Sequence, residues 1–251
     1  MNNQALFNFL LRIGDTNLIL AQRLSEWTGH GPFLEEDLAL TNIALDLFGT
    51  SRSVLEYAAK IEEKGRTEDD LAFLRGEREF VNPLICELPN GDYAFTIARQ
   101  CIVDAFQLHF YSELVKSKDE TIAGISAKAI KETKYHFRHS ASWMERFGNG
   151  TEESHERLQN ALNFIWAYTE DVFATDAGYN ELIKTGIVPE MAAIKSAWEK
   201  SMNEVLAKSS VSKPENVFMQ KGSLKGIHTE QFGYLLTEMQ YMQRAFPGAK
   251  W

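Results

Sequence analysis

Proline is sparse in this sequence, with six residues in 251. Because proline interrupts helices, the long segments without it are free to remain helical. These segments carry apolar residues at helical spacing, as Phe9, Ile13, Leu20, Leu24 and Trp27 do along the first of them. Strand alternation is lacking, apart from a short piece at 217–220 that we expect to be extended. The pattern predicts an all-α chain, with helices over 5–27, 33–64, 67–80, 92–116, 119–147, 151–175, 189–208 and 229–246, and an irregular stretch over 176–188.

The order of the long helices indicates how they pack. The first two are joined by a short turn and form a hairpin, and the helices at 92–116 and 119–147 form another. Two such hairpins make up a four-helix bundle. We therefore expect one domain over 1–251, with a bundle core at about 5–147 and a C-terminal helical extension at about 151–251.

Composition limits the kinds of partner that the chain can bind and the cellular compartment in which we expect it. Hydrophobic residues make up 44% of the chain, which is enough for a sizeable core. The net charge of −9 argues against nucleic acid or an anionic membrane as the main partner. Two cysteines, Cys86 and Cys101, suggest a reducing compartment without a disulfide framework. With no apolar run near the ~20 residues of a membrane span and no signal-peptide pattern, we expect a cytoplasmic protein.

Helical bundles of this plan can hold a dinuclear metal centre. Such a centre takes a Glu from each of two helices and a Glu-x-x-His pair from each of the other two, all pointing inward. Carboxylate oxygens and imidazoles suit non-haem iron, and an i, i+3 pair places both ligands on one face of a helix. A chain that carries this chemistry should therefore show acids and histidines at these positions.

The sequence fills this pattern only in part. Asp104 and Glu132 occupy acid positions of the second hairpin, and Asp15, 89 residues before Asp104, occupies one in the first. The same shift places Ile43 opposite Glu132 and Asp46 opposite Tyr135. Of six nominal positions four are acidic, and neither histidine position holds histidine. The centre is degenerate as a metal site, and we predict no metal ligand, cofactor or catalytic residue in this chain. Its polar positions are Asp15, Asp46, Asp104, Glu132, Tyr135 and His136.

Some polar residues could have either a metal-binding or a purely structural role. Glu132, His136 and His139 share one helix face and could bind a single metal ion, although pairing inside the protein with Asp104, Lys128 or Arg138 is favoured. Glu152–His155 is the one Glu-x-x-His in the chain, but acids in a first helical turn are typical of a helix start. His228 opens the last helix and is predicted to be a solvated end residue.

Many ordered motifs along the whole chain resemble the C subunits of bacterial phenylacetyl-CoA epoxidases, which are multicomponent oxygenases of phenylacetate breakdown. The tail is the most distinctive part, with Gly226-Ile227-His228-Thr229-Glu230 and then Pro247-Gly248-Ala249-Lys250-Trp251. The other matching segments are 11–15, 22–30, 36–47, 88–92, 126–132 with Tyr135-His136, 146–151 and 238–241.

This resemblance implies a ferritin-like fold and a structural role. In that family a related A subunit holds the di-iron centre and epoxidises the aromatic ring, and further components deliver electrons from a nicotinamide cofactor. The C subunit is a non-catalytic partner, which agrees with the missing histidines at positions 46 and 135. The expected partner is thus the catalytic A subunit, with self-association as a further candidate.

Two other functions would fit a helical carboxylate bundle. A self-sufficient di-iron oxidase or oxygenase with an irregular ligand set predicts about two irons per chain. Iron storage requires a closed cage and a ferroxidase site, and the missing ligands and the extra helices after Gly150 disfavour it. Metal content separates the structural subunit from the oxidase.

Overall fold

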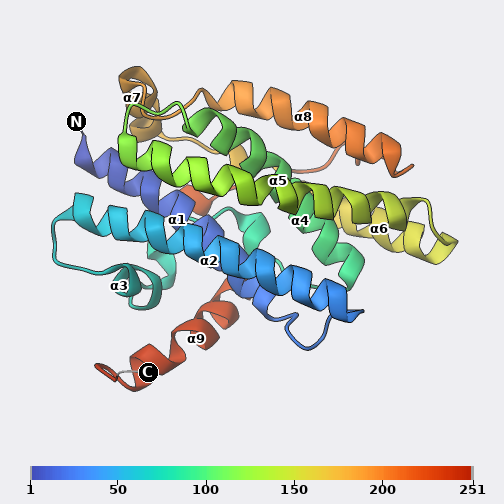
Figure 1. Ribbon diagram of the computed structural model, residues 1–251, viewed down its shortest axis with the longest axis horizontal. Coiled ribbons are helices and arrows are strands. Elements are labelled where there is room, and N and C mark those ends of the chain that lie inside the picture. Colours follow the sequence, from blue (N-terminus) through green and yellow to red (C-terminus); the bar gives the residue numbers. More distant parts are fainter. Residues whose placement is uncertain (1, 250–251) are drawn as a thin grey trace. The chain divides into compact units, whose positions relative to one another are not determined.

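Every regular element of the chain is helical in the computed structural model, which describes residues 2–249 (Figure 1). The predicted all-α class is confirmed. Several helices begin at side chains that cap free backbone N–H groups. Asn2 accepts from Ala5 N, Asp92 from Phe95 N, Asp119 from Ile122 N, and Thr151 from Ser154 N.

The first hairpin consists of α1 (Asn3–Ser25) and α2 (Leu34–Glu62), which pack closely along their lengths (Figure 1). Gly14 makes this approach possible, because a Cβ atom there would lie 2.5 Å from Leu55 Cδ2. At the same level Ser51 Oγ donates to the carbonyl oxygen of Gly14 at 2.9 Å. The contact surface at this point is therefore a glycine facing a leucine and a serine.

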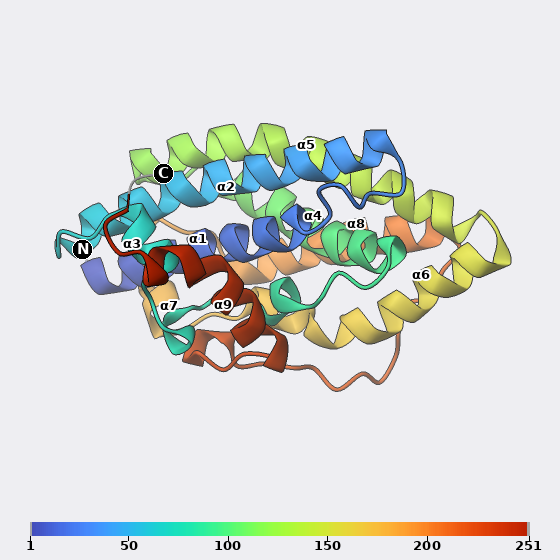
Figure 2. The same cartoon turned by 90° about the horizontal axis from the view of Figure 1, so that it is seen from below.

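Four elements cover this hairpin from one side. They are α3 (Glu68–Phe73), the 3₁₀ turns η1 (Glu77–Glu79) and η2 (Leu84–Glu87), and the last helix α9 (Glu230–Ala245), which packs on all three (Figure 2). The helix predicted over 67–80 thus ends at Phe73, and the rest of that segment turns inward. The C-terminal segment therefore packs on its own unit through α9, and Lys250 and Trp251 lie outside the described residues.

The second hairpin consists of α4 (Tyr93–Leu114) and α5 (Glu120–Gly148), and α6 (Glu152–Ile165) and α8 (Met191–Lys208) pack on it. Trp198 of α8 donates its indole N–H to the carbonyl oxygen of Ile102 at 3.0 Å. Gly148 ends α5 against the segment that follows α8, where a Cβ atom would lie 1.7 Å from the carbonyl oxygen of Ser209.

Two predictions between these helices are wrong. The stretch 176–188, expected to be irregular, contains α7 (Ala177–Thr185), and 217–220 forms no strand. The predicted helix over 151–175 continues after α6 only as the 3₁₀ turns η3 (Trp166–Tyr168) and η4 (Glu170–Phe173). A further 3₁₀ turn, η5 (Ser223–Lys225), precedes α9.

By contacts the chain forms two compact units, which interleave along the sequence. The first contains the described residues up to Pro89, then Asp176–Leu182 and those from Gly222 onward; the second contains Asn90–Thr175 and Ile183–Lys221. Each hairpin belongs to one unit and has its own covering helices. The expected single domain over 1–251 stays a prediction.

Candidate functional site

Asp15 lies on α1 and is completely buried. The guanidinium of Arg75 binds it with two hydrogen bonds, from Nη1 to Oδ2 at 3.0 Å and from Nη2 to Oδ1. The backbone N–H of Val81 donates to Oδ2 at 3.0 Å. Both carboxylate oxygens are thus engaged by donors of the protein itself, as a buried acid requires.

Arg75 is itself fixed from several sides. It follows α3, its side chain is buried, and it donates to the carbonyl oxygen of Glu79 at 2.9 Å while its guanidinium lies 4.0 Å from the centre of the Phe80 ring. From α9, Gln240 and Arg244 donate to the carbonyl oxygen of Arg75 at 2.9 and 3.0 Å. The last helix, α9, therefore helps to fix the position of the arginine that binds Asp15.

Asp104, on α4, is also completely buried, but within residues 2–249 no arginine or lysine forms an ion pair with it. Ser140 Oγ of α5 donates to its Oδ2 at 2.7 Å, and Gln100 Nε2 donates to its Oδ1 at 2.6 Å. Burial raises the pKa of Asp104 to about 7, although both hydrogen bonds favour the charged form. Burial, together with the nearby Asp104, also raises the pKa of the Cys101 thiol.

The other residues predicted for the bundle centre differ in how far they are exposed to solvent. His136 is buried, and its carbonyl oxygen accepts from Ser140 Oγ at 3.0 Å, so Ser140 links it to Asp104. Glu132 is partly exposed and lies 3.7 Å from Lys128 Nζ, an exposed pair of low strength. Asp46 is half-buried on α2. The two hairpins thus bury one aspartate each, and the remaining acids lie nearer the surface.

Tyr135 departs from its predicted inward position. Its side chain is 42% exposed on the outside of α5. The ring stacks on His139, with centroids 6.2 Å apart and planes at 27°. A helix turns by about 100° per residue, so a buried His136 and an exposed Tyr135 are consistent with each other. The position that would hold a histidine ligand therefore points to solvent.

The side chains present do not fit a dinuclear iron centre. At Asp15 an arginine already supplies the positive charge that a metal ion would bring, and it occupies both oxygens. At Asp104 the two donors are neutral, and a pKa raised to about 7 by burial leaves the group partly protonated at neutral pH, whereas a metal ligand must be a carboxylate. Across residues 2–249, no three His, Cys, Asp or Glu side chains gather in a way that could hold a metal ion.

A third buried acid, Glu87, was missed by the sequence analysis. It lies in η2 and is buried. Its carboxylate accepts hydrogen bonds from Asn82 Nδ2 at 2.9 Å and from the backbone N–H of Thr229 at 2.7 Å. His228 Nδ1 lies 2.5 Å from its Oε1, and His228 Nε2 donates to the carbonyl oxygen of Phe80 at 3.1 Å.

The prediction that His228 is a solvated end residue is therefore wrong, because its side chain is buried. The ring also stacks on Phe232, with centroids 4.2 Å apart. Together these contacts fix the start of α9. By contrast, Thr151 and the first turn of α6 form the helix start predicted for Glu152–His155, and His155 Nδ1 bonds to the carbonyl oxygen of Gly148 at 2.8 Å.

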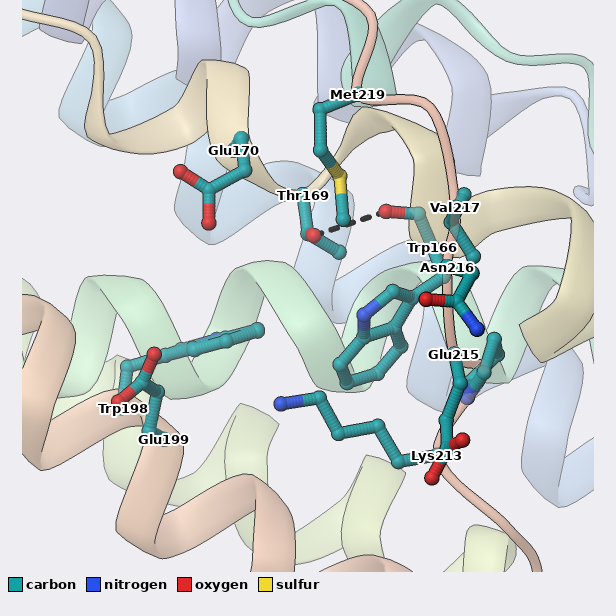
Figure 3. A pocket seen from close by; sticks show the side chains of 11 residues that line it. Trp166, Thr169, Glu170, Trp198, Glu199, Lys213, Glu215, Asn216, Val217 and Met219 are labelled. Atoms are coloured by element: carbon teal, nitrogen blue, oxygen red, sulfur yellow. Dashed lines mark hydrogen bonds between the residues drawn. The ribbon is translucent and has the colours of Figure 1, made fainter.

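A surface pocket of about 480 Å³ lies in the second unit, between η3, α8 and the segment 213–219 (Figure 3). Trp166 and Trp198 form its floor, with ring centroids 5.9 Å apart, and Lys213 Nζ lies 5.7 Å from the centre of the Trp166 ring. Glu170, Glu199 and Glu215 stand around it, and the described residues that line it include neither histidine nor cysteine. Both tryptophans are nearly fully buried and belong to the core.

Comparison with known proteins gives two matches. The family model described as "Phenylacetic acid catabolic protein" matches residues 1–251. The chain is 45% identical over 243 residues to the C subunit of the 1,2-phenylacetyl-CoA epoxidase of Escherichia coli (strain K12). The aligned region covers 97% of this chain and 98% of that relative. The resemblance seen in the motifs is confirmed over the full length, and with it the ferritin-like class. Among the described helices, none is both long and apolar enough to cross a membrane.

Proposed function

The chain belongs to the family of phenylacetic acid catabolic proteins, and from this premise we propose that it is the non-catalytic structural subunit of a multicomponent oxygenase. The complex epoxidises the ring of phenylacetyl-CoA in aerobic phenylacetate degradation. Its di-iron centre belongs to a related catalytic subunit, which this chain supports. Electrons come from further components, and the assembly works in the cytoplasm.

The observation that carries this proposal is that groups of the protein itself bind both carboxylate oxygens of Asp15. In a metal-holding bundle an inward acid must keep an oxygen available for the ion. Here Arg75 and the N–H of Val81 take up both oxygens, and breaking such a buried ion pair is costly. A metal could enter this position only by displacing the arginine.

The outer surface offers a second line of support. Leu34, Leu38 and Leu45 lie on one face of α2 and are each more than half exposed. Their spacing of four and seven residues aligns them along the helix. Exposed apolar side chains gathered in this way mark surfaces that bind other proteins. A subunit that works by association needs such surfaces, whereas a self-contained oxidase does not.

The proposal is tested by reconstituting the oxygenase from separately purified subunits and measuring turnover of phenylacetyl-CoA. We expect no turnover from this chain with the electron-transfer components alone, and turnover once the catalytic subunit is added. The variants Asp104→Asn and Glu132→Gln should leave the complex within about twofold of wild type, because neither residue touches the reacting atoms. Turnover by this chain without the catalytic subunit would overturn the proposal. So would a loss of about a hundredfold or more in either variant with the complex still assembled.

A further inference from the structure

The chain is acidic, but α5 is basic. The whole sequence has 26 Lys and Arg against 35 Asp and Glu. Within α5 the balance reverses, with five basic and three acidic residues. A local reversal of this kind creates a positive field on a negative molecule. The question is whether these charges are neutralised within the fold or directed outward.

They are directed outward. Lys131, Lys134, Tyr135 and Arg138 are all exposed, and their spacing of i, i+3, i+4 and i+7 places them on one helix face. We call these four residues the α5 basic face. Arg138 lies over the Tyr135 ring, with its Cζ 5.6 Å from the ring centre. The face therefore presents an aromatic ring held between positive charges.

The fold does not neutralise this face. In the part of the chain that the structure describes, no carboxylate forms an ion pair with Lys131, Lys134 or Arg138. The adjacent Glu132 turns toward Lys128 at 3.7 Å, and Glu145 lies two turns further along the helix. Three positive charges thus remain available to a partner.

The shape of the face decides which partner suits it. Its residues spread over about 10 Å along the outside of a helix, and the convex surface does not enclose a small anion. Exposed tyrosine and arginine side chains are enriched at the centres of protein–protein interfaces. A positive face also selects a partner surface of the opposite charge.

We propose that the α5 basic face is a docking surface for an acidic surface of another protein subunit, with Tyr135 as its aromatic anchor. This inference rests on the proposed function, because it takes the partner to be a subunit of the same oxygenase. It also gives Tyr135 a role. The position that holds an inward histidine in a metal-binding bundle here carries an outward contact residue.

The test measures the dissociation constant between the purified chain and its purified catalytic subunit at low and at high salt. The variant Lys131→Glu/Arg138→Glu reverses two charges of the face, and we expect it to weaken binding at least about tenfold at low salt and less at high salt. Tyr135→Ala should weaken binding by about tenfold at both salt concentrations, because it removes an apolar contact.

The matched control is Lys200→Glu/Lys221→Glu, which makes the same change in net charge at two exposed lysines of the second unit. It should stay within about twofold of wild type. Circular dichroism checks that all variants remain helical, as expected since the replaced side chains lie outside the core. Equal weakening in the control and in the α5 variant would show a nonspecific charge effect and overturn the proposal.

The outcomes separate this inference from the proposed function. If wild type binds the catalytic subunit and the α5 variants bind equally well, the docking surface is wrong and the structural role stands. If wild type does not bind the catalytic subunit, both are wrong. If the α5 variants change only the self-association of the chain, the face joins two copies and the proposed partner is wrong.

Discussion

Asp15 and Asp104 occupy matching positions in the two helical hairpins, and both are completely buried, yet the protein satisfies them by different means. Asp15 has a cation, because Arg75 binds both of its oxygens. Asp104 has two neutral donors, Ser140 and Gln100, and a pKa raised to about 7 by burial. A buried acid can be stabilised by a positive charge or by a proton. Asp15 has the positive charge of Arg75, and the raised pKa of Asp104 means that it binds a proton more readily than an ordinary aspartate.

The difference follows from what surrounds each hairpin. The first unit wraps its hairpin with α3 and α9, and the turn after α3 delivers Arg75. The second unit covers its hairpin with α6 and α8, and the polar groups that bind Asp104 come from its own helix and from α5. We infer that the two acids differ because a covering segment supplies a cation in the first unit and none does so at Asp104, and four predictions test this comparison.

The largest effect is expected at Arg75. The variant Arg75→Met leaves the Asp15 carboxylate buried without a cation, and such a loss costs about 3–5 kcal/mol in the free energy of unfolding. Urea denaturation followed by circular dichroism measures it. The matched change in the second hairpin, Ser140→Ala, removes one neutral donor from Asp104 and should cost about 1–3 kcal/mol.

The double variant Asp15→Asn/Arg75→Met serves as the control for charge. It removes the carboxylate together with its partner, so most of the lost stability should return. If Arg75→Met costs no more than Ser140→Ala, the two acids do not differ in the way described.

The second prediction concerns pH. In the folded chain Asp104 has a pKa of about 7, against 3.8 for an ordinary aspartate. Between these pH values the folded state holds a proton that the unfolded state has released, so the free energy of unfolding must fall as pH rises. Over the full range this loss is on the order of 4 kcal/mol.

The variant Asp104→Asn should remove this part of the pH dependence. Its amide can donate to Gln100 Oε1, which has no hydrogen-bond partner among the described residues. We therefore expect the variant to be more stable than wild type at pH 8 and similar to it at pH 5, as urea titrations at both pH values would reveal. A wild-type slope that persists in Asp104→Asn would assign the effect to another group.

The third prediction tests how the first unit holds its covering helix. Replacing His228 by alanine removes the imidazole that contacts both the Glu87 carboxylate and the carbonyl oxygen of Phe80, and should cost about 1–3 kcal/mol. Amide hydrogen exchange in α9 should rise, while exchange in α4 and α5 should stay unchanged. Uniform acceleration over both units would mean that α9 is not specifically held by this contact.

The smallest effect is expected at an exposed ion pair. Lys60 Nζ binds Glu56 Oε1 at 2.7 Å on the outside of α2, and this bond lowers the pKa of Glu56. Solvent screens such pairs, so Lys60→Gln should shift the melting temperature by less than Ser140→Ala does. A shift as large as that of Arg75→Met would contradict the distinction between buried and exposed pairs.

The sequence predicted the helical class, most helix starts and the two buried aspartates, because these depend on periodicity and on residues within a few turns. It did not predict the partner of Asp15, because Arg75 lies 60 residues away and reaches it only after α3 ends early. The outward Tyr135 and the buried His228 were missed for the same reason. Their exposure depends on neighbouring elements, and no local pattern encodes it.

We propose that these acids are occupied by the protein itself, and that the chain therefore holds no iron of its own. Elemental analysis of iron in the chain purified alone, and again after co-expression with the proposed catalytic subunit, tests this most directly. We predict iron well below one atom per chain in the chain alone, and in the complex only the amount that the catalytic subunit accounts for. About two irons per chain in the isolated protein, the content of a dinuclear bundle, would contradict the account and favour a self-sufficient di-iron enzyme.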